Sequence, residues 1–193
     1  FTFFLSFTQT NVDSNPLELI GIIDFNVPEG GINGKAIHVL ANQDINDLSI
    51  YGLGIANNGG GTDGQEYTFP IMSVSAGDHI LVARNIDAMN AYMSASTNWQ
   101  HVIQGDTNIS MNGDDAIELF YNSSVIETFG NPDVDGSGQA WEYMDSWAYK
   151  IDGNWTYGVV NCTDGSTTSC SSSCPYPFIP CPTTPITDAN FNQ

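Results

Sequence analysis

The pattern of oxygen-bearing side chains in residues 131–142, NPDVDGSGQAWE, has the most specific chemical meaning in the chain. Side-chain oxygens recur at alternate positions, a glycine stands at the sharp turn, and a glutamate closes the segment, as in a calcium-binding loop. The spacing predicts Ca²⁺ ligands at Asn131, Asp133, Asp135, Ser137 and Glu142. A plain turn is the alternative, because Asp caps its own backbone and Gly accepts left-handed torsion angles without any metal.

The cysteines near the C-terminal end of the chain indicate disulfide chemistry. All four lie in a segment rich in Ser, Thr and Pro that has little core of its own, which predicts two disulfides among Cys162, Cys170, Cys174 and Cys181. Zinc is the weaker alternative, since paired C-x2-C units and a nearby His are lacking. Disulfides form in oxidising compartments, so we expect an extracellular protein, secreted or part of a cell-surface appendage.

Glycosylation is compatible with such a compartment. The sequence contains N-x-S/T sequons, the acceptor sites of N-linked glycans, at Asn108, Asn122, Asn154 and Asn161. Several sequons are also expected by chance in a chain so rich in Asn and Ser, so these four positions are candidates only.

The other chemically active residue types do not form a catalytic pattern. His38, His79 and His101 lie far apart in the sequence and lack the spacing of metal ligands or of a triad. Asp114 and Asp115 stand where a strand begins, which favours a turn over an acid–base pair. A nucleophile elbow of the form G-x-S-x-G is missing. We therefore expect no enzymatic activity.

The charge composition excludes several kinds of partner. Three basic residues stand against 22 acidic ones, and the formal net charge is −19. Nucleic acid would be repelled, and no basic patch exists to release its counterions. No segment approaches the run of about 20 apolar residues that spans a bilayer. The acidic excess suits a protein that stays soluble by self-repulsion or that recruits divalent cations.

The N-terminal residues alternate between apolar and polar side chains. Phe1, Phe3, Leu5 and Phe7 would form one continuous apolar face on a strand over residues 1–10. No charge precedes Asp13, and such a strand at a free edge is an aggregation hazard, so it must be buried. Residues 11–16 form a polar linker, which favours a donor strand that completes the sheet of a neighbouring copy. The alternatives are a first strand of the chain's own domain and a remnant of a signal peptide.

Strand signals dominate the remainder of the chain. Apolar or β-branched runs bounded by turn residues occur at 17–23, 36–40, 48–51, 67–71, 79–83, 116–121, 125–129 and 147–151. Helical periodicity is confined to residues 86–95. Short strands with turn chemistry between them predict an all-β fold, an antiparallel β-sandwich. The alternation is lost after Trp155, so residues 161–193 are expected to form a loop-rich extension that the disulfides hold.

Four blocks between residues 17 and 130 resemble a known family. They read LELIGIID, KAIHVLANQDINDLSIYGLGIANNGGG, QEYTFPIMSVSAGDHILVA and SMNGDDAIELFYNSSVIETFG. Their order is similar to that of the lamin-tail domain, an immunoglobulin-like sandwich found in many secreted bacterial proteins. Asp47-Leu48-Ser49, Phe69-Pro70, Ala76-Gly77-Asp78 and residues 113–119 fit the family pattern. The resemblance implies a fold and an accessory or interaction role, and it carries no active site.

These observations predict three parts: an N-terminal strand arm and linker (1–16), a lamin-tail-like sandwich (17–160) and a Cys-, Ser- and Pro-rich extension (161–193). The expected function is that of a structural subunit, which assembles with copies of itself into an extracellular filament by donor-strand addition. The alternative is a secreted, calcium-dependent module that binds glycans or a surface.

Overall fold

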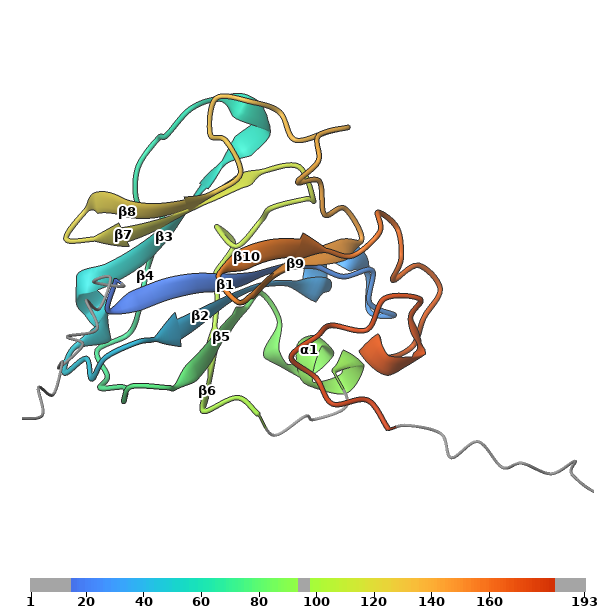
Figure 1. Cartoon of the computed structure of the whole chain (residues 1–193), viewed down its shortest axis with the longest axis horizontal. Coiled ribbons are helices and arrows are strands. Elements are labelled where there is room, and N and C mark those ends of the chain that lie inside the picture. Colours follow the sequence, from blue (N-terminus) through green and yellow to red (C-terminus); the bar gives the residue numbers. More distant parts are fainter. Residues whose placement is uncertain (1–14, 94–97, 183–193) are drawn as a thin grey trace, which may run out of the picture.

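The computed structural model describes residues 15–93 and 98–182, which form two β-sheets packed face to face (Figure 1). The strand order is β10-β9-β1-β2-β5-β6 in the six-stranded sheet and β4-β3-β7-β8 in the four-stranded sheet. The all-β sandwich predicted from the sequence is therefore confirmed. Within the described residues, no helix is both long and apolar enough to cross a membrane.

The larger sheet contains β1 (Leu17–Asp24), β2 (Lys35–Ala41), β5 (His79–Ala83), β6 (His101–Gln104), β9 (Ser146–Ile151) and β10 (Asn154–Tyr157). The smaller sheet contains β3 (Tyr51–Ala56), β4 (Tyr67–Thr68), β7 (Ala116–Tyr121) and β8 (Ser124–Phe129). The one α-helix of the described residues, α1 (Ile86–Tyr92), falls within the predicted helical segment. It begins where the side chain of Asn85 accepts a hydrogen bond from the backbone N–H of Ala88.

One pair of strands departs from the antiparallel arrangement that the sequence predicts. β5 and β6 run parallel, with Ile80 beside His101 and Ala83 beside Gln104. Parallel neighbours need a crossover connection, and here α1 lies in that connection. The other ladder pairs of the two sheets are antiparallel.

The predicted strand at residues 48–51 is wrong. Residues Leu48–Ile50 form a 3-10 turn, because the Asp47 carboxylate accepts hydrogen bonds from both the backbone N–H and the hydroxyl of Ser49. The strand β3 starts only at Tyr51. The glycines of β3 weaken the alternating pattern by which a strand is recognised in the sequence. In the structure, Gly52 and Gly54 leave room for Gln65 and Phe120 to pack closely against the backbone.

Two apolar layers are buried on opposite faces of the larger sheet. The inner core lies between the two sheets and includes Leu19 and Ile22 of β1 and Leu119 of β7. A second, outer cluster lies on the other face, where Ile23 of β1 packs with Met89 of α1 and other residues. Adjacent positions of β1 thus point into different apolar layers, which explains the nearly continuous apolar run of this strand.

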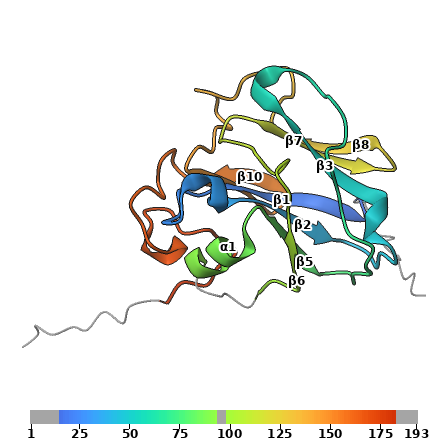
Figure 2. The same cartoon turned by 180° about the vertical axis from the view of Figure 1, so that it is seen from behind.

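The C-terminal extension covers the outer face of the larger sheet beside α1 (Figure 2). It contributes Tyr176, which is fully buried, and Ile179 to the outer cluster. Disulfides join Cys162 to Cys174 and Cys170 to Cys181, which confirms that the four cysteines form two bridges. The described residues of the extension, 161–182, have little regular structure of their own, so the sheet and the bridges together hold them in place.

Candidate functional site

A groove of about 530 Å³ opens at the end of the sandwich where the described chain begins. Its apolar lining includes Ile45, Ile50, Tyr121 and Ile126, from the β2–β3 connection and from the β7–β8 hairpin. Ile50 is 37% exposed and Tyr121 41% exposed, so both side chains are accessible within the groove. Because the lining comes from separate segments of the chain, the groove could not be predicted from a sequence motif.

Two tyrosines form a pair within the groove. Tyr51 of β3 and Tyr121 of β7 are directly opposite in the ladder, and their ring centroids lie 5.2 Å apart. Burial raises the pKa of Tyr51, and the neighbouring Tyr121 adds to that shift. The Tyr51 hydroxyl therefore remains neutral over the physiological pH range.

The rim of the groove is polar and acidic. Asp44 and Asp47 contribute carboxylates, while Asn15, Gln43 and Asn46 contribute amides. Hydrogen bonds from Ser49 lower the pKa of Asp47, so this carboxylate stays charged. The groove thus combines an apolar lining with a negative rim, and a ligand must present apolar side chains without acidic neighbours to fit it.

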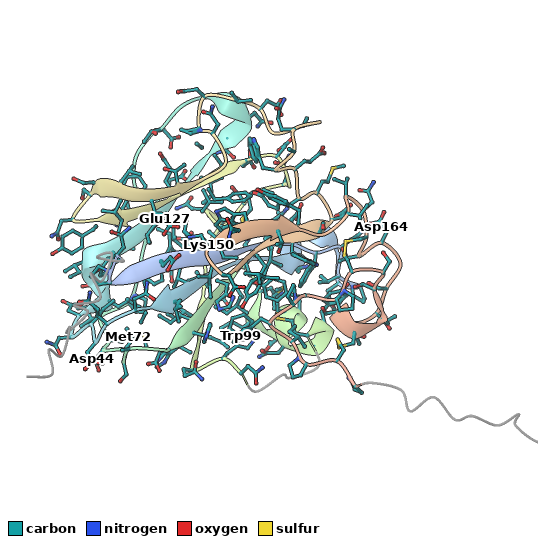
Figure 3. All side chains as sticks on the ribbon, viewed as in Figure 1. Asp44, Met72, Trp99, Glu127, Lys150 and Asp164 are labelled. Atoms are coloured by element: carbon teal, nitrogen blue, oxygen red, sulfur yellow. A yellow bond between two sulfur atoms is a disulfide. The ribbon has the colours of Figure 1, made fainter. Side chains whose placement is uncertain are left out.

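An ion-pair cluster lies beside the groove and joins the two sheets. Lys150 of β9 donates hydrogen bonds to Glu18 of β1 and Glu127 of β8, and Figure 3 shows Lys150 close to Glu127. The second Glu127 oxygen accepts from the backbone N–H of Leu19 at 2.9 Å. Lys150 also lies 5.1 Å from the ring centroid of Trp155. This cluster fixes β8 against the larger sheet.

The Glu18 carboxylate retains its charge in the cluster. Burial alone would raise its pKa, but hydrogen bonds from Lys150 and Asn42 outweigh burial and leave the pKa below the usual value. The side chain of Asn42 donates to a Glu18 oxygen at 3.0 Å. The cluster is therefore a stable pairing of a cation with two anions near the groove.

The predicted calcium loop is exposed, and its side-chain oxygens hold the turn itself. The side chain of Asn131 accepts from the backbone N–H of Asp133, Asp135 accepts from that of Ser137, and Glu142 accepts from that of Gly138. The contacts of Asn131 and Asp135, each to the N–H two residues later, are typical of Asx turns. No group of three His, Cys, Asp or Glu side chains with metal-binding geometry is found in the described part of the chain. Calcium at Asn131, Asp133, Asp135, Ser137 and Glu142 stays a prediction.

The three histidines, distant in sequence, are brought together by the neighbouring strands β2, β5 and β6. One ring nitrogen of His38 lies 2.9 Å from His79, and the other lies 3.0 Å from the Tyr176 hydroxyl. His101 lies 3.0 Å from the carboxylate of Asp78. Burial lowers the pKa of His38 well below its usual value, and the neighbouring His79 lowers it further. His38 and His79 therefore form a neutral, hydrogen-bonded pair beneath the C-terminal extension.

The four sequons differ in exposure. Asn122, Asn154 and Asn161 are exposed, whereas Asn108 is half-buried. The side-chain amide of Asn108 donates to the backbone carbonyl of Glu66 at 2.9 Å, so a glycan on this nitrogen would compete with that hydrogen bond. The exposed three are the better acceptors on structural grounds.

The predicted donor strand, with Phe1, Phe3, Leu5 and Phe7, lies outside the described residues. Comparison of the chain with protein-family models, with curated proteins and with solved structures found no match. The lamin-tail resemblance therefore remains an expectation from the sequence blocks, and the function must be argued from the geometry of the molecule.

Proposed function

We propose that this protein is a structural subunit of an extracellular filament, in which the N-terminal strand of one copy completes the sandwich of the next. The observation that carries the proposal is the groove lined by Ile45, Ile50, Tyr121 and Ile126. Its volume of about 530 Å³ is in the range that accommodates several large apolar groups. A stripe of Phe1, Phe3, Leu5 and Phe7 has the chemistry to fill it.

Main-chain pairing supports the same occupant. In the described part of the chain, β8 has a ladder partner only on its β7 side. A strand edge of this kind is a template for strand addition. Ile126 of β8 lines the groove, so a strand laid along this edge would place alternate side chains into it. The side-chain amide of Asn15 donates to the Ile126 carbonyl at 3.2 Å, so the described chain begins beside this strand.

The charge pattern also fits a strand that comes from a neighbouring copy. Residues 1–12 carry no charged side chain, whereas the chain as a whole has a net charge of −19. An uncharged arm approaches the acidic rim without the repulsion that two acidic surfaces would experience. Strand exchange of this type is a heterologous contact, which produces a filament when it does not close into a ring. The two disulfides support assembly in an oxidising, extracellular compartment.

Deletion of residues 1–10 tests the proposal. The full chain is expected to form polymers in size-exclusion chromatography with light scattering and in negative-stain images. The deleted chain is expected to be monomeric, with an unchanged far-UV circular dichroism spectrum. The double variant Phe3→Ser and Leu5→Ser keeps the length of the arm and is expected to weaken assembly likewise. Unchanged assembly of the deleted chain contradicts the proposal.

A calcium-dependent module that binds glycans is the second candidate. The tyrosine pair and the amides of the rim favour it, because aromatic faces and side-chain amides are common partners of sugars. This candidate expects monomers that bind a glycan array with Ca²⁺ present and lose binding with a chelator. It also expects a lower melting temperature in chelator, since an ion bound only to the folded state stabilises it. An unchanged melting temperature contradicts a calcium role.

A further inference from the structure

A lysine and an aspartate are buried together at the end of the inner core. Lys35 begins β2 and Asp24 ends β1, and the two residues are direct partners in the antiparallel ladder. The Lys35 Nζ atom lies 2.7 Å from an Asp24 carboxylate oxygen. Asp24 is 3% exposed and Lys35 6% exposed. A buried ion pair of this kind is costly, because both charges have left water.

Carboxylates outnumber cations at this position. Asp115, just before β7, and Asp145, just before β9, both lie close enough for the Lys35 charge to act to lower their pKa values. Burial acts more strongly in the opposite direction and leaves the pKa of both residues raised. For Asp24, burial raises the pKa to about 6 despite the opposing charge of Lys35. The raised pKa of Asp24 favours proton transfer from Lys35 to Asp24 across their 2.7 Å contact.

Asp145 lies next to the Asp24 carboxyl group, because the following residue, Ser146, is the ladder partner of Asp24. Its backbone N–H acts to lower the pKa of Asp24, although burial of Asp24 outweighs this effect. Its φ of 47° lies in the left-handed region, which few residues other than Gly, Asn and Asp adopt. Thr163 holds this conformation, because its backbone N–H and its hydroxyl both donate to the Asp145 carbonyl, at 3.1 and 2.8 Å. Asp145 is therefore held in a fixed conformation next to the Asp24–Lys35 pair.

We propose that Lys35 and Asp24 form an intramolecular isopeptide bond, an amide between Nζ and the side-chain carboxyl carbon. The free amine of Lys35 adds to the protonated carboxyl, a C–N bond forms, and the C–O bond to the hydroxyl group breaks. The hydroxyl leaves as water with a proton from the amine. The net reaction converts an ammonium and a carboxylate into a neutral amide and one water, and no electrons are transferred. Asp145, whose charge acts on Asp24 and which is itself acted on by Lys35, relays the proton from Nζ to the leaving hydroxyl.

Burial and contact geometry favour this reaction. The contact holds the amine against the carboxyl group, which replaces an encounter of two separate molecules with a reaction inside one site. The amide carries no charge, so the reaction removes two charges from a buried position. The bond would tie β1 to β2 independently of the filament proposal.

The Lys150 cluster is an internal control for this chemistry. Lys150 also contacts carboxylates, but the pKa of Glu18 is lowered there, so that carboxyl group remains ionised and unreactive towards an amine. Its side chain is also more exposed, at 12% for Lys150 and 28% for Glu18. The cross-link is therefore assigned to the more deeply buried pair, Lys35 and Asp24, whose side chains are 8% and 5% exposed, against 16% for Glu127.

Intact mass spectrometry of the folded, purified protein after denaturation and reduction tests the proposal. Reduction opens both disulfides, so they do not contribute to the mass difference. The chain is expected to be lighter than its sequence mass by one water, and the variants Asp24→Ala and Lys35→Arg are expected to have their full mass. In Asp24→Asn the same amide forms with loss of ammonia, so its product has the mass of the cross-linked wild-type chain. A wild-type chain with its full sequence mass overturns the proposal.

Trypsin digestion locates the bond. The chain has three sites, after Lys35, Arg84 and Lys150. The cross-linked chain is expected to resist cleavage after Lys35 and to be cut at the other two. A missing water that maps to Lys150 instead overturns the assignment.

The variant Asp145→Asn tests the proton relay. It removes the titratable carboxyl group and keeps the backbone conformation, because Asn tolerates the left-handed region. Slower accumulation of the lighter species supports the relay, and an unchanged rate refutes it.

Discussion

At the scale of single residues, a few buried polar groups distinguish this molecule from a plain apolar sandwich. Lys35 and Lys150 each lie among carboxylates inside or beside the inner core. His38 is fully buried below the C-terminal extension. Burying such groups is costly unless each finds a partner, so their pairing specifies how the strands and the extension pack together.

The ion-pair cluster gives the first prediction. Replacing Lys150 by Met leaves Glu18 and Glu127 without their cation, which is expected to cost about 3 kcal/mol of stability. Denaturant unfolding followed by tryptophan fluorescence measures the loss. The double variant Lys150→Met and Glu127→Gln is the control and is expected to recover part of the lost stability.

The same cluster predicts a pH dependence. Because the pKa of Glu18 is lowered from 4.5, the stability that Glu18 contributes is present above that pH and is lost as the pH falls. If the wild type loses no more stability on acidification than Lys150→Met does, the Glu18–Lys150 pairing is not the source of this pH dependence.

The hydrogen-bonded histidines, His38 and His79, give a second prediction, in which the titrating group is an imidazole and not a carboxylate. Burial lowers the pKa of His38 well below 6.5, so the unfolded chain binds a proton there more readily than the folded chain. Stability is therefore expected to decrease as the pH falls below 6.5. His38→Gln should flatten this dependence in thermal melts between about pH 5 and pH 7. The same slope in the variant and the wild type would show that His38 is not responsible.

At the scale of elements, the C-terminal extension depends on its two bridges. Each bridge closes a short loop, with sequence separations of 12 and 11 residues. Replacing Cys170 and Cys181 together by Ser is expected to lower stability by about 2–4 kcal/mol. The buried Tyr176 should then become accessible, which hydrogen exchange of the outer cluster would detect. Unchanged protection would mean that packing alone holds the extension.

The sequence predicts the strands that carry clear alternation, such as residues 79–83 and 116–121, because both faces or one face of these strands pack into apolar layers. It misplaces β3, where glycines weaken the pattern and Asp47 caps a turn. It also misses β6 and β10, which have four residues each. Short strands carry too few positions for a period to be recognised.

The candidate sites could be predicted from the sequence only where their residues are close together in the chain. The cysteines are close in sequence, so their bridging was predictable. The groove, the Lys150 cluster and the Asp24–Lys35 pair join segments that only the sheet topology brings together, and composition alone did not indicate them. The histidines also appear isolated in the sequence, yet β2, β5 and β6 are neighbours in one sheet.

At the scale of the whole molecule, the described chain begins and ends at opposite ends of the long axis (Figure 1). The groove lies where the described chain begins, lined by Asn15 and Pro16. A strand arm that folds back would fill the groove of its own copy, whereas an arm that reaches away would fill the groove of the next copy. The polar linker at residues 11–16 allows the second arrangement, which repeats along a filament.

A complementation measurement distinguishes these two arrangements most directly. One variant lacks residues 1–10 and keeps the groove, and the other keeps the arm but carries Ile50→Arg in the groove. Val159→Arg, at an exposed apolar residue outside the groove, is the matched control and is expected to assemble as the wild type does. Each of the two variants alone is expected to be monomeric, and their equimolar mixture is expected to form a 1:1 dimer by light scattering. A mixture that stays monomeric, or Ile50→Arg chains that polymerise alone, would contradict donor-strand assembly.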